Sequence, residues 1–201
     1  MLIEKELPLS LDKLIAIGTE EESVVPGVKD ATEELKQFFH DRLRVMQKDQ
    51  GFTAHEVESV IGSEPAILAD VPKRLKAVHD FMSLPEAESL AAANKRIENI
   101  LKKNTLPLAD AVDPALLTEK EEKDLYEAIR TLEPKLEADY KAGRYEDELR
   151  SLAPLKAPVD AFFDKVMVNA EDEALRRNRL TLLNELHKAM NQVAKLSCLA
   201  S

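Results

Sequence analysis

The side chains best suited to chemistry in this sequence are two short runs of basic and amide residues. They are Lys95, Arg96, Asn99 and Lys103, and further along Arg176, Asn178 and Arg179. Guanidinium groups grip phosphates and stack on bases, and an asparagine amide reads base edges, so these residue types are typical of RNA contacts. The simpler alternative is that they are solvated helix-surface residues, with Arg179 paired to an acidic neighbour.

Catalytic chemistry has no comparable pattern. The sequence lacks a glycine-rich phosphate loop, and its four histidines form neither an HExxH motif nor a His/Cys pairing. The dipeptide His40-Asp41 binds metal in some phosphohydrolases, but no further ligand pattern accompanies it, and a helix-surface position is favoured. We interpret Glu119, Glu121 and Glu122 as a solvated face that supplies helix-start charge. We therefore predict no catalytic, cofactor-binding or metal-binding residues.

The composition limits both the fold and the partners. Hydrophobic residues make up 44% of the 201 positions and aromatic residues only 4%, and five glycines stand against 33% charged residues. This balance favours long helices around a Leu, Ala, Val and Ile core. The formal net charge of −10 opposes broad nucleic-acid affinity, so an RNA contact needs a local basic patch, and we expect no DNA partner.

No feature of the sequence indicates a membrane or exported protein. No apolar run approaches the ~20 residues of a membrane span, and the N-terminal residues lack the basic start and apolar core of a signal peptide. Cys198 is the only cysteine, so no intrachain disulfide can form. These features favour a cytoplasmic location without membrane contact.

Apolar residues recur at helical spacing along the chain, and no convincing strand pattern is present. We predict an all-α fold, an antiparallel bundle of about seven helices. Residues 1–25 are a short leader, interpreted as the end of a preceding domain, and residues 26–201 form the helical domain. Helices are expected at about 26–50, 53–62, 70–82, 86–103, 118–142 and 145–155, and in two apolar segments of 159–199 flanking the polar joint 169–173.

The helix at 26–50 should pack through one apolar face, because its large side chains recur at intervals of three and four residues. That face consists of Leu35, Phe38, Phe39, Leu43 and Met46. Capping boxes at Thr53–Glu56 and Thr118–Glu121 mark the starts of two other helices.

Three segments resemble the bacterial glycyl-tRNA synthetase beta subunit family. They are Phe39-His40-Asp41-Arg42-Leu43 through Gln50-Gly51-Phe52; Ala91–Ile97 with Asn99-Ile100-Leu101; and Phe162–Val168 followed by Arg176, Asn178-Arg179-Leu180 and Leu182-Leu183. Their order and rough spacing match the C-terminal end of that family, so the resemblance covers nearly the whole chain. Residues 119–155 match least distinctly.

In that family this region is an all-helical, DALR-like anticodon-binding domain, similar to the bundle that follows the catalytic domain in arginyl- and cysteinyl-tRNA synthetases, which are class I enzymes. The resemblance implies binding to tRNA(Gly) and association with a synthetase alpha subunit in an alpha2beta2 tetramer. ATP and Mg serve the parent enzyme, glycine–tRNA ligase, so the chain itself is expected to hold no cofactor and no catalytic site.

Carried over residue by residue, the resemblance places the tRNA contacts at the two runs named at the outset. It places Ile97, Phe162 and Phe163 in the core, and it makes Asn94 and Asp164 candidates for buried structural polar groups. The alternative function is that of a non-catalytic, acidic helical module that binds another protein, which would show no salt-dependent RNA binding.

The tRNA-binding interpretation makes a strict demand on the fold. The guanidinium and ammonium groups of Arg96, Lys103, Arg176 and Arg179 must gather on one side of the bundle. A structure that scatters them, or that uses them in internal ion pairs, contradicts that mechanism.

Overall fold

The structure is a computed structural model that describes residues 3–22 and 32–200, with the backbone alone at 19–22. These residues form nine α-helices and four short 3-10 helices, and they contain no β-strand. The predicted all-α class is confirmed, with nine helices rather than about seven. The helices are α1 (Leu11–Glu22), α2 (Thr32–Asp49), α3 (Ala54–Ile61), α4 (Val71–Met82), α5 (Ala87–Lys103), α6 (Lys120–Lys141), α7 (Tyr145–Arg150), α8 (Lys156–Lys165) and α9 (Glu173–Met190).

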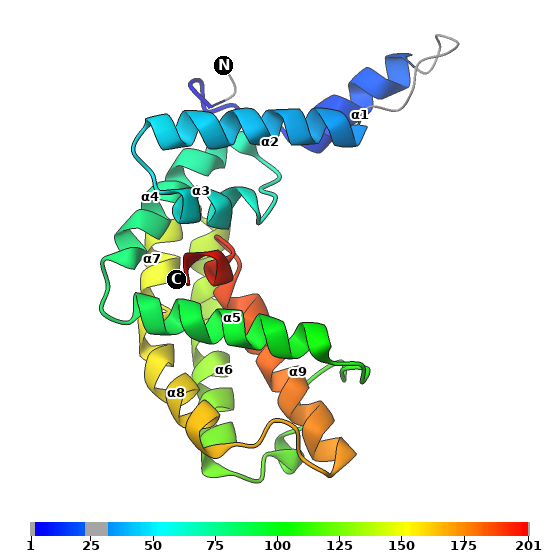
Figure 1. Ribbon diagram of the computed structural model, residues 1–201, viewed down its shortest axis with the longest axis vertical. Coiled ribbons are helices and arrows are strands. Elements are labelled where there is room, and N and C mark those ends of the chain that lie inside the picture. Colours follow the sequence, from blue (N-terminus) through cyan, green and yellow to red (C-terminus); the bar gives the residue numbers. More distant parts are fainter. Residues whose placement is uncertain (1–2, 23–31, 201) are drawn as a thin grey trace.

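The helices stack into an elongated, curved molecule (Figure 1). Helices α1 and α2 lie across one end, and α6, α8 and α9 extend to the other end. Helix α5 crosses the middle of the stack, where it packs against α8, α9 and the C-terminal 3-10 helix η4 (Leu196–Leu199). This crossing brings α5 and α9, which carry the two basic runs, into contact.

Local capping interactions fix two of the helix starts. The predicted box at Thr53 is confirmed, because its hydroxyl accepts from the Glu56 amide at 3.2 Å and the Glu56 carboxylate accepts from the Thr53 amide at 2.7 Å. The second box lies one residue later than predicted. Glu122, not Glu121, accepts from the amide of Glu119 at 2.8 Å.

One continuous apolar core runs through the stack. Ile97 and Phe162 are fully buried, as predicted, whereas Phe163 is half-buried at the edge of the core. Burial of these large side chains is the main force that holds α5 against α8 and α9.

The predicted inward face of α2 is wrong in its first half. Leu43 is buried and Met46 is half-buried, but Leu35, Phe38 and Phe39 are 40%, 58% and 37% exposed. The physical reason is that α2 packs mainly on α1 and α3 along one edge, so that most of its first half stays exposed in the described structure. The predicted start of this helix at 26 and the predicted domain boundary at 25/26 lie outside the described residues.

Candidate nucleic-acid interface

The polar face of α5 carries the first predicted run. Leu90, Ala91 and Ile97 turn the opposite face of this helix into the core, and helical periodicity therefore sends residues 95, 96, 99 and 103 outward. All four of these side chains are exposed, as a surface contact requires. The last turn of α5 is basic, which also favours the helix because cations stabilise the negative end of its dipole.

A shallow hollow of about 350 Å³ follows this face of α5. It is lined by Ala92, Lys95, Arg96, Asn99, Ile100 and Lys103. Each member of the first predicted run is thus brought to one surface.

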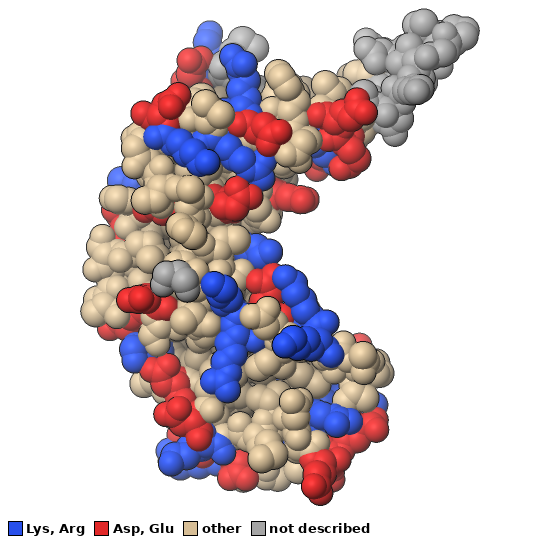
Figure 2. Space-filling view, in the orientation of Figure 1, with Lys and Arg blue, Asp and Glu red and all other residues tan. Residues whose placement is uncertain are grey.

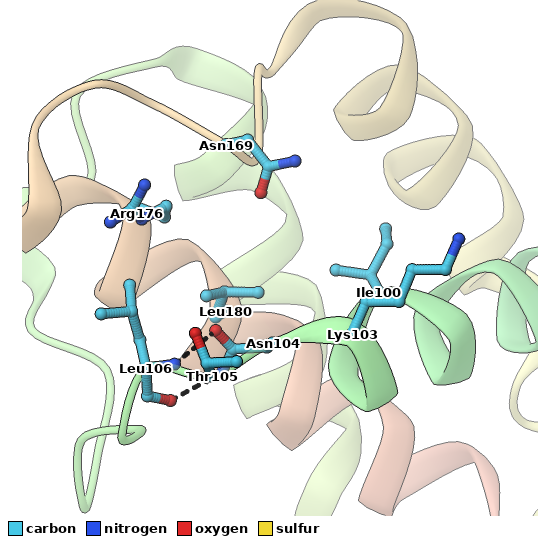
Figure 3. Close-up of a pocket in the computed structure, with 8 residues that line it drawn as sticks. All are labelled: Ile100, Lys103, Asn104, Thr105, Leu106, Asn169, Arg176 and Leu180. Atoms are coloured by element: carbon cyan, nitrogen blue, oxygen red, sulfur yellow. Dashed lines mark hydrogen bonds between the residues drawn. The ribbon is translucent and has the colours of Figure 1, made fainter.

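A second hollow, of about 470 Å³, opens where the end of α5 meets the start of α9. It is lined by Ile100, Lys103, Asn104, Thr105, Leu106, Asn169, Arg176 and Leu180. Figure 3 shows Arg176 and Lys103 on opposite sides of this hollow, with Asn169 at its edge between them. Arg176 lies in the first turns of α9, and its Nε is buried without a hydrogen-bond partner among the described residues.

The two hollows share Ile100 and Lys103, so they form one continuous surface, which we call the α5–α9 groove. None of its lining residues is acidic, although the chain has 38 acidic and 28 basic residues. Figure 2 shows Lys and Arg side chains gathered over α5 on this face of the molecule. The groove is therefore a local site of positive potential on a negatively charged protein.

Two contacts hold basic side chains in place along the groove. The guanidinium carbon of Arg96 lies 4.2 Å from the centroid of the Phe163 ring, a cation–π stack, yet Arg96 remains exposed. The ammonium group of Lys95 donates a hydrogen bond to the carbonyl of Ala200 at 3.2 Å. These contacts restrict both side chains before any ligand arrives, which lowers the entropy lost on binding.

The nearest carboxylate on α5 is neutralised by two lysines. Oε1 of Glu98 lies 2.6 Å from the ammonium of Lys102 and 3.1 Å from that of Lys195. Burial raises the pKa of Glu98, but hydrogen bonds from Lys102, Ser197 and Lys195 outweigh burial and bring the pKa to about 2. This negative charge is compensated beside the groove, so it opposes an approaching phosphate less than a free carboxylate would.

Arg179 does not take part in this surface, and its predicted role as a direct tRNA contact is wrong. The demand that four cations gather on one side therefore fails for Arg179 and is met only by Arg96, Lys103 and Arg176. The Arg179 side chain is buried, with Nε 2.6 Å from Oε1 of Glu122. It also donates to the Met167 carbonyl at 2.9 Å and to the Thr118 hydroxyl at 3.3 Å. Arg179 is therefore an internal clamp that joins α9, the start of α6 and the loop between α8 and α9.

Asn178 is the second predicted contact that the structure removes from the surface. Its amide is 3% exposed. It donates to the Asp113 carbonyl at 3.0 Å and accepts from the Asp113 amide at 2.8 Å. The side chain holds the loop before α6 against α9. Because the amide oxygen and nitrogen of Asn178 are both bonded to the Asp113 backbone, they do not read a base edge.

Glu122 and Asp164 also differ from prediction. Glu122 was expected on a solvated face but is fully buried. Burial raises its pKa, while hydrogen bonds from Arg179 and the Glu119 amide outweigh that effect and leave the pKa below its usual value. Of the two candidate buried polar groups, Asn94 is fully buried and Asp164 is exposed.

Sequence reasoning missed three polar residues of the groove: Asn104, Thr105 and Asn169. The amide of Asn104 is bonded to both backbone groups of Leu106, at 2.7 and 2.9 Å, and so shapes the turn after α5. Asn169 is exposed at the edge of the hollow. The only signal for Asn169 was its place in the polar joint 169–173.

Other kinds of site find little support in the part of the chain that the structure describes. No group of three or more His, Cys, Asp or Glu side chains there could hold a metal ion. Asp41, from the His40-Asp41 pair, is engaged by Arg44 and Gln37 at 2.9 and 2.8 Å. No described helix combines the length and apolar character needed to cross a membrane.

Comparison with known proteins identifies a protein family for the region that contains the groove. The family model described as DALR anticodon binding domain matches residues 90–197, more than half of the chain. That range contains every residue of the groove.

Several curated relatives match the whole chain. The glycine–tRNA ligase beta subunit of Delftia acidovorans is 51% identical over 205 residues, and that of Dechloromonas aromatica is 49% identical over 201 residues. The same subunit of Nitrosomonas eutropha is 46% identical over 214 residues. The chain spans 28–30% of the length of these three relatives.

Proposed function

The chain belongs to the DALR anticodon-binding domain family, and we propose that it binds the anticodon arm of a transfer RNA in the α5–α9 groove. The observation that carries this proposal is the groove itself. A surface free of acidic residues, lined by Lys95, Arg96, Lys103 and Arg176, lies on a chain of net charge −10. Selection for solubility alone gives no reason to collect cations on one face.

The groove offers distinct groups for the two parts of a nucleotide. Lys103 and Arg176 line opposite sides of the second hollow, where they bind phosphate oxygens of the loop. The Arg96 guanidinium, held over the Phe163 ring, offers a planar group on which an unstacked base lies. Exposed amides, Asn99 on α5 among them, then read base edges. Single-stranded anticodon loops present these elements together.

The relatives indicate which tRNA is the ligand. Because they are beta subunits of glycine–tRNA ligase, we propose tRNA(Gly) as the ligand and a synthetase alpha subunit as the protein partner, in an alpha2beta2 tetramer in the cytoplasm. In this role the chain binds and orients tRNA(Gly). ATP-dependent glycylation takes place elsewhere in that complex, and the groove contributes no reacting group.

The proposal is tested by fluorescence-anisotropy titration of the chain with labelled RNAs at several salt concentrations. We expect saturable binding of tRNA(Gly), weaker binding of the same tRNA with its anticodon bases replaced, and weaker binding still of single-stranded DNA of equal length. Affinity should fall as salt rises, because each phosphate contact releases counterions.

The outcome also separates the proposal from its alternative. An acidic module that only binds proteins would bind none of these RNAs, and equal affinity for all of them would reduce the groove to a non-specific phosphate site. Either result would overturn anticodon recognition by this chain.

A further inference from the structure

Exposed apolar side chains are concentrated at one end of this molecule. Eight large hydrophobic residues are exposed in the described part of the chain, and seven of them lie between positions 9 and 45. Only Met167 lies within the range matched by the DALR family. The apolar residues that lack cover are thus almost confined to α1, α2 and the segment before them.

The exposed residues of α2 form an ordered face. Leu35, Phe38 and Val45 lie at i, i+3 and i+10, which places them along one side of the helix. They are 40%, 58% and 61% exposed. The rings of Phe38 and Phe39 pack edge to face with centroids 5.8 Å apart, so the pair forms a rigid apolar projection.

A hollow of about 400 Å³ borders this face. Its apolar lining includes Ile3, Phe39 and Met46, and its charged lining residues are Glu4 and Arg42. An apolar area with a few charges beside it is the composition of a protein–protein interface core and rim, whereas RNA-binding surfaces are strongly basic.

On α1, Leu11 and Ile15 are buried while Leu14 and Ile17 are 39% and 58% exposed. Helix α1 therefore has apolar groups on two sides, of which α2 and the chain near residue 66 cover one. A helix that is apolar on two sides is typical of a helix between two packed layers.

We propose that this α1–α2 face is the docking surface for the remainder of a longer beta-subunit polypeptide. The relatives supply the occupant, because about 72% of the Delftia acidovorans and Dechloromonas aromatica subunits, the complement of the 28% covered, lies outside the matched region. Domains of one polypeptide that pack on each other typically bury about 600–1,500 Å² at their interface. In the described part of the chain, the exposed apolar side chains that such an interface needs are gathered on the α1–α2 face. Helices α1 and α2 lie at the opposite end of the molecule from the start of α9 (Figure 1). The inference does not depend on tRNA binding.

Hydroxyl-radical footprinting tests the proposal on the isolated chain and on a chimera. In the chimera this chain replaces the matched 205-residue region of the Delftia acidovorans subunit. Oxidation of Phe38 and Phe39 should fall about fivefold in the chimera, since the core of a docked interface is packed like a protein interior. Met167, which is 71% exposed and far along the chain, is the internal control and should react equally in both. Equal oxidation of Phe38 and Phe39 in the two proteins would overturn the proposal.

Two measurements on the isolated chain test the proposal without the chimera. The variant Phe38→Ser/Phe39→Ser should keep its helix content and lose little of its Tm, because the two side chains are 58% and 37% exposed and so give only part of their surface to the packing of this chain. A large fall in Tm would show that they belong to its own core. Sedimentation velocity must show a monomer. A dimer that the same variant dissociates would make a second copy the occupant and would overturn the proposal.

Discussion

Nε of Arg179 lies 2.6 Å from Oε1 of Glu122, and their side chains are only 6% and 0% exposed. The pair joins α9 to the start of α6. Through a second bond, to the Met167 carbonyl at 2.9 Å, the same guanidinium fixes the loop that carries Asn169 to the edge of the groove. The buried arginine thus supports the interface from behind rather than contacting the ligand.

Breaking this pair should strongly destabilise the protein. Arg179→Met leaves the Glu122 carboxylate buried without its cation, and we expect the free energy of unfolding to fall by about 3–5 kcal/mol. Urea denaturation measures this loss. Lys141→Met, which removes an exposed ion pair with Glu137 at 2.6 Å, is the control and should change stability by less than about 1 kcal/mol. Similar losses in the two variants would contradict the clamp.

Stability should fall as pH rises from about 4.5 to about 8 because of Glu148. This carboxyl is fully enclosed, and neither oxygen has a hydrogen-bond partner among the described residues. Burial raises its pKa to about 8, with Asp139 adding to the rise and Arg74 and Lys135 opposing it. The pKa of Glu148 in the folded protein exceeds its unfolded value of 4.5. Its contribution to the free energy of unfolding is therefore complete below pH 4.5 and is lost as pH rises towards 8.

The expected slope is up to about 1.4 kcal/mol of unfolding free energy per pH unit in that interval. Urea denaturation of wild type and Glu148→Gln from pH 5 to pH 8.5 measures it. The stability of the variant relative to wild type should rise steadily with pH, while other titrating groups cancel in the difference. A difference that does not change with pH would show that Glu148 is not protonated in the fold.

The opposite pH dependence is expected from Glu98, whose pKa is lowered to about 2. Its contribution is present above the unfolded pKa of 4.5 and is lost as pH falls towards 2. Glu98→Gln should therefore cost about 1–3 kcal/mol at pH 7 and much less at pH 3. Thermal unfolding at the two pH values checks this, and an equal loss at both would contradict it.

The Arg96 guanidinium that stacks on Phe163 should contribute to tRNA affinity through its planar shape as well as through its charge. Arg96→Lys keeps the positive charge and loses the planar guanidinium, so tRNA affinity should fall about fivefold, roughly 1 kcal/mol, with an unchanged salt slope. Arg96→Ala should weaken binding further and also lower the slope. Anisotropy titrations distinguish the two. Wild-type affinity in Arg96→Lys would show that Arg96 acts only as a charge.

The α5 half of the groove could be predicted from sequence because helical period alone decides which residues share a face. Once Leu90 and Ile97 are assigned to the core, Arg96, Asn99 and Lys103 must point away from it. The place of Asn169 at the edge of the groove was harder to predict. Asn169 lies in an irregular loop, and its position depends on a tertiary clamp that local patterns do not encode.

The error at Arg179 could have been avoided. Arg179 lies four residues after Leu175 and three before Leu182, in the middle of the apolar stripe of α9. Glu122 likewise lies three residues before Leu125, in the stripe of α6. A cation and an anion that interrupt two facing apolar stripes predict a buried pair. The error on α2 has another origin, since its stripe was identified correctly but no element among residues 3–22 and 32–200 covers its first half.

The measurement that tests tRNA binding in the groove most directly compares two double variants of equal charge. Lys103→Ala/Arg176→Ala removes the two cations that line the second hollow. Lys123→Ala/Arg150→Ala removes two exposed cations from α6 and α7, outside the groove. Circular dichroism establishes that both variants are folded before tRNA(Gly) affinity is measured over a range of salt concentrations.

We predict that the groove variant binds at least about tenfold more weakly and that its slope of log affinity against log salt is smaller by about 1.5, the value for two lost phosphate contacts. The control variant should behave like wild type. Equal affinities and equal slopes for the two variants would contradict the account, because the cations of the α5–α9 groove would then hold no RNA.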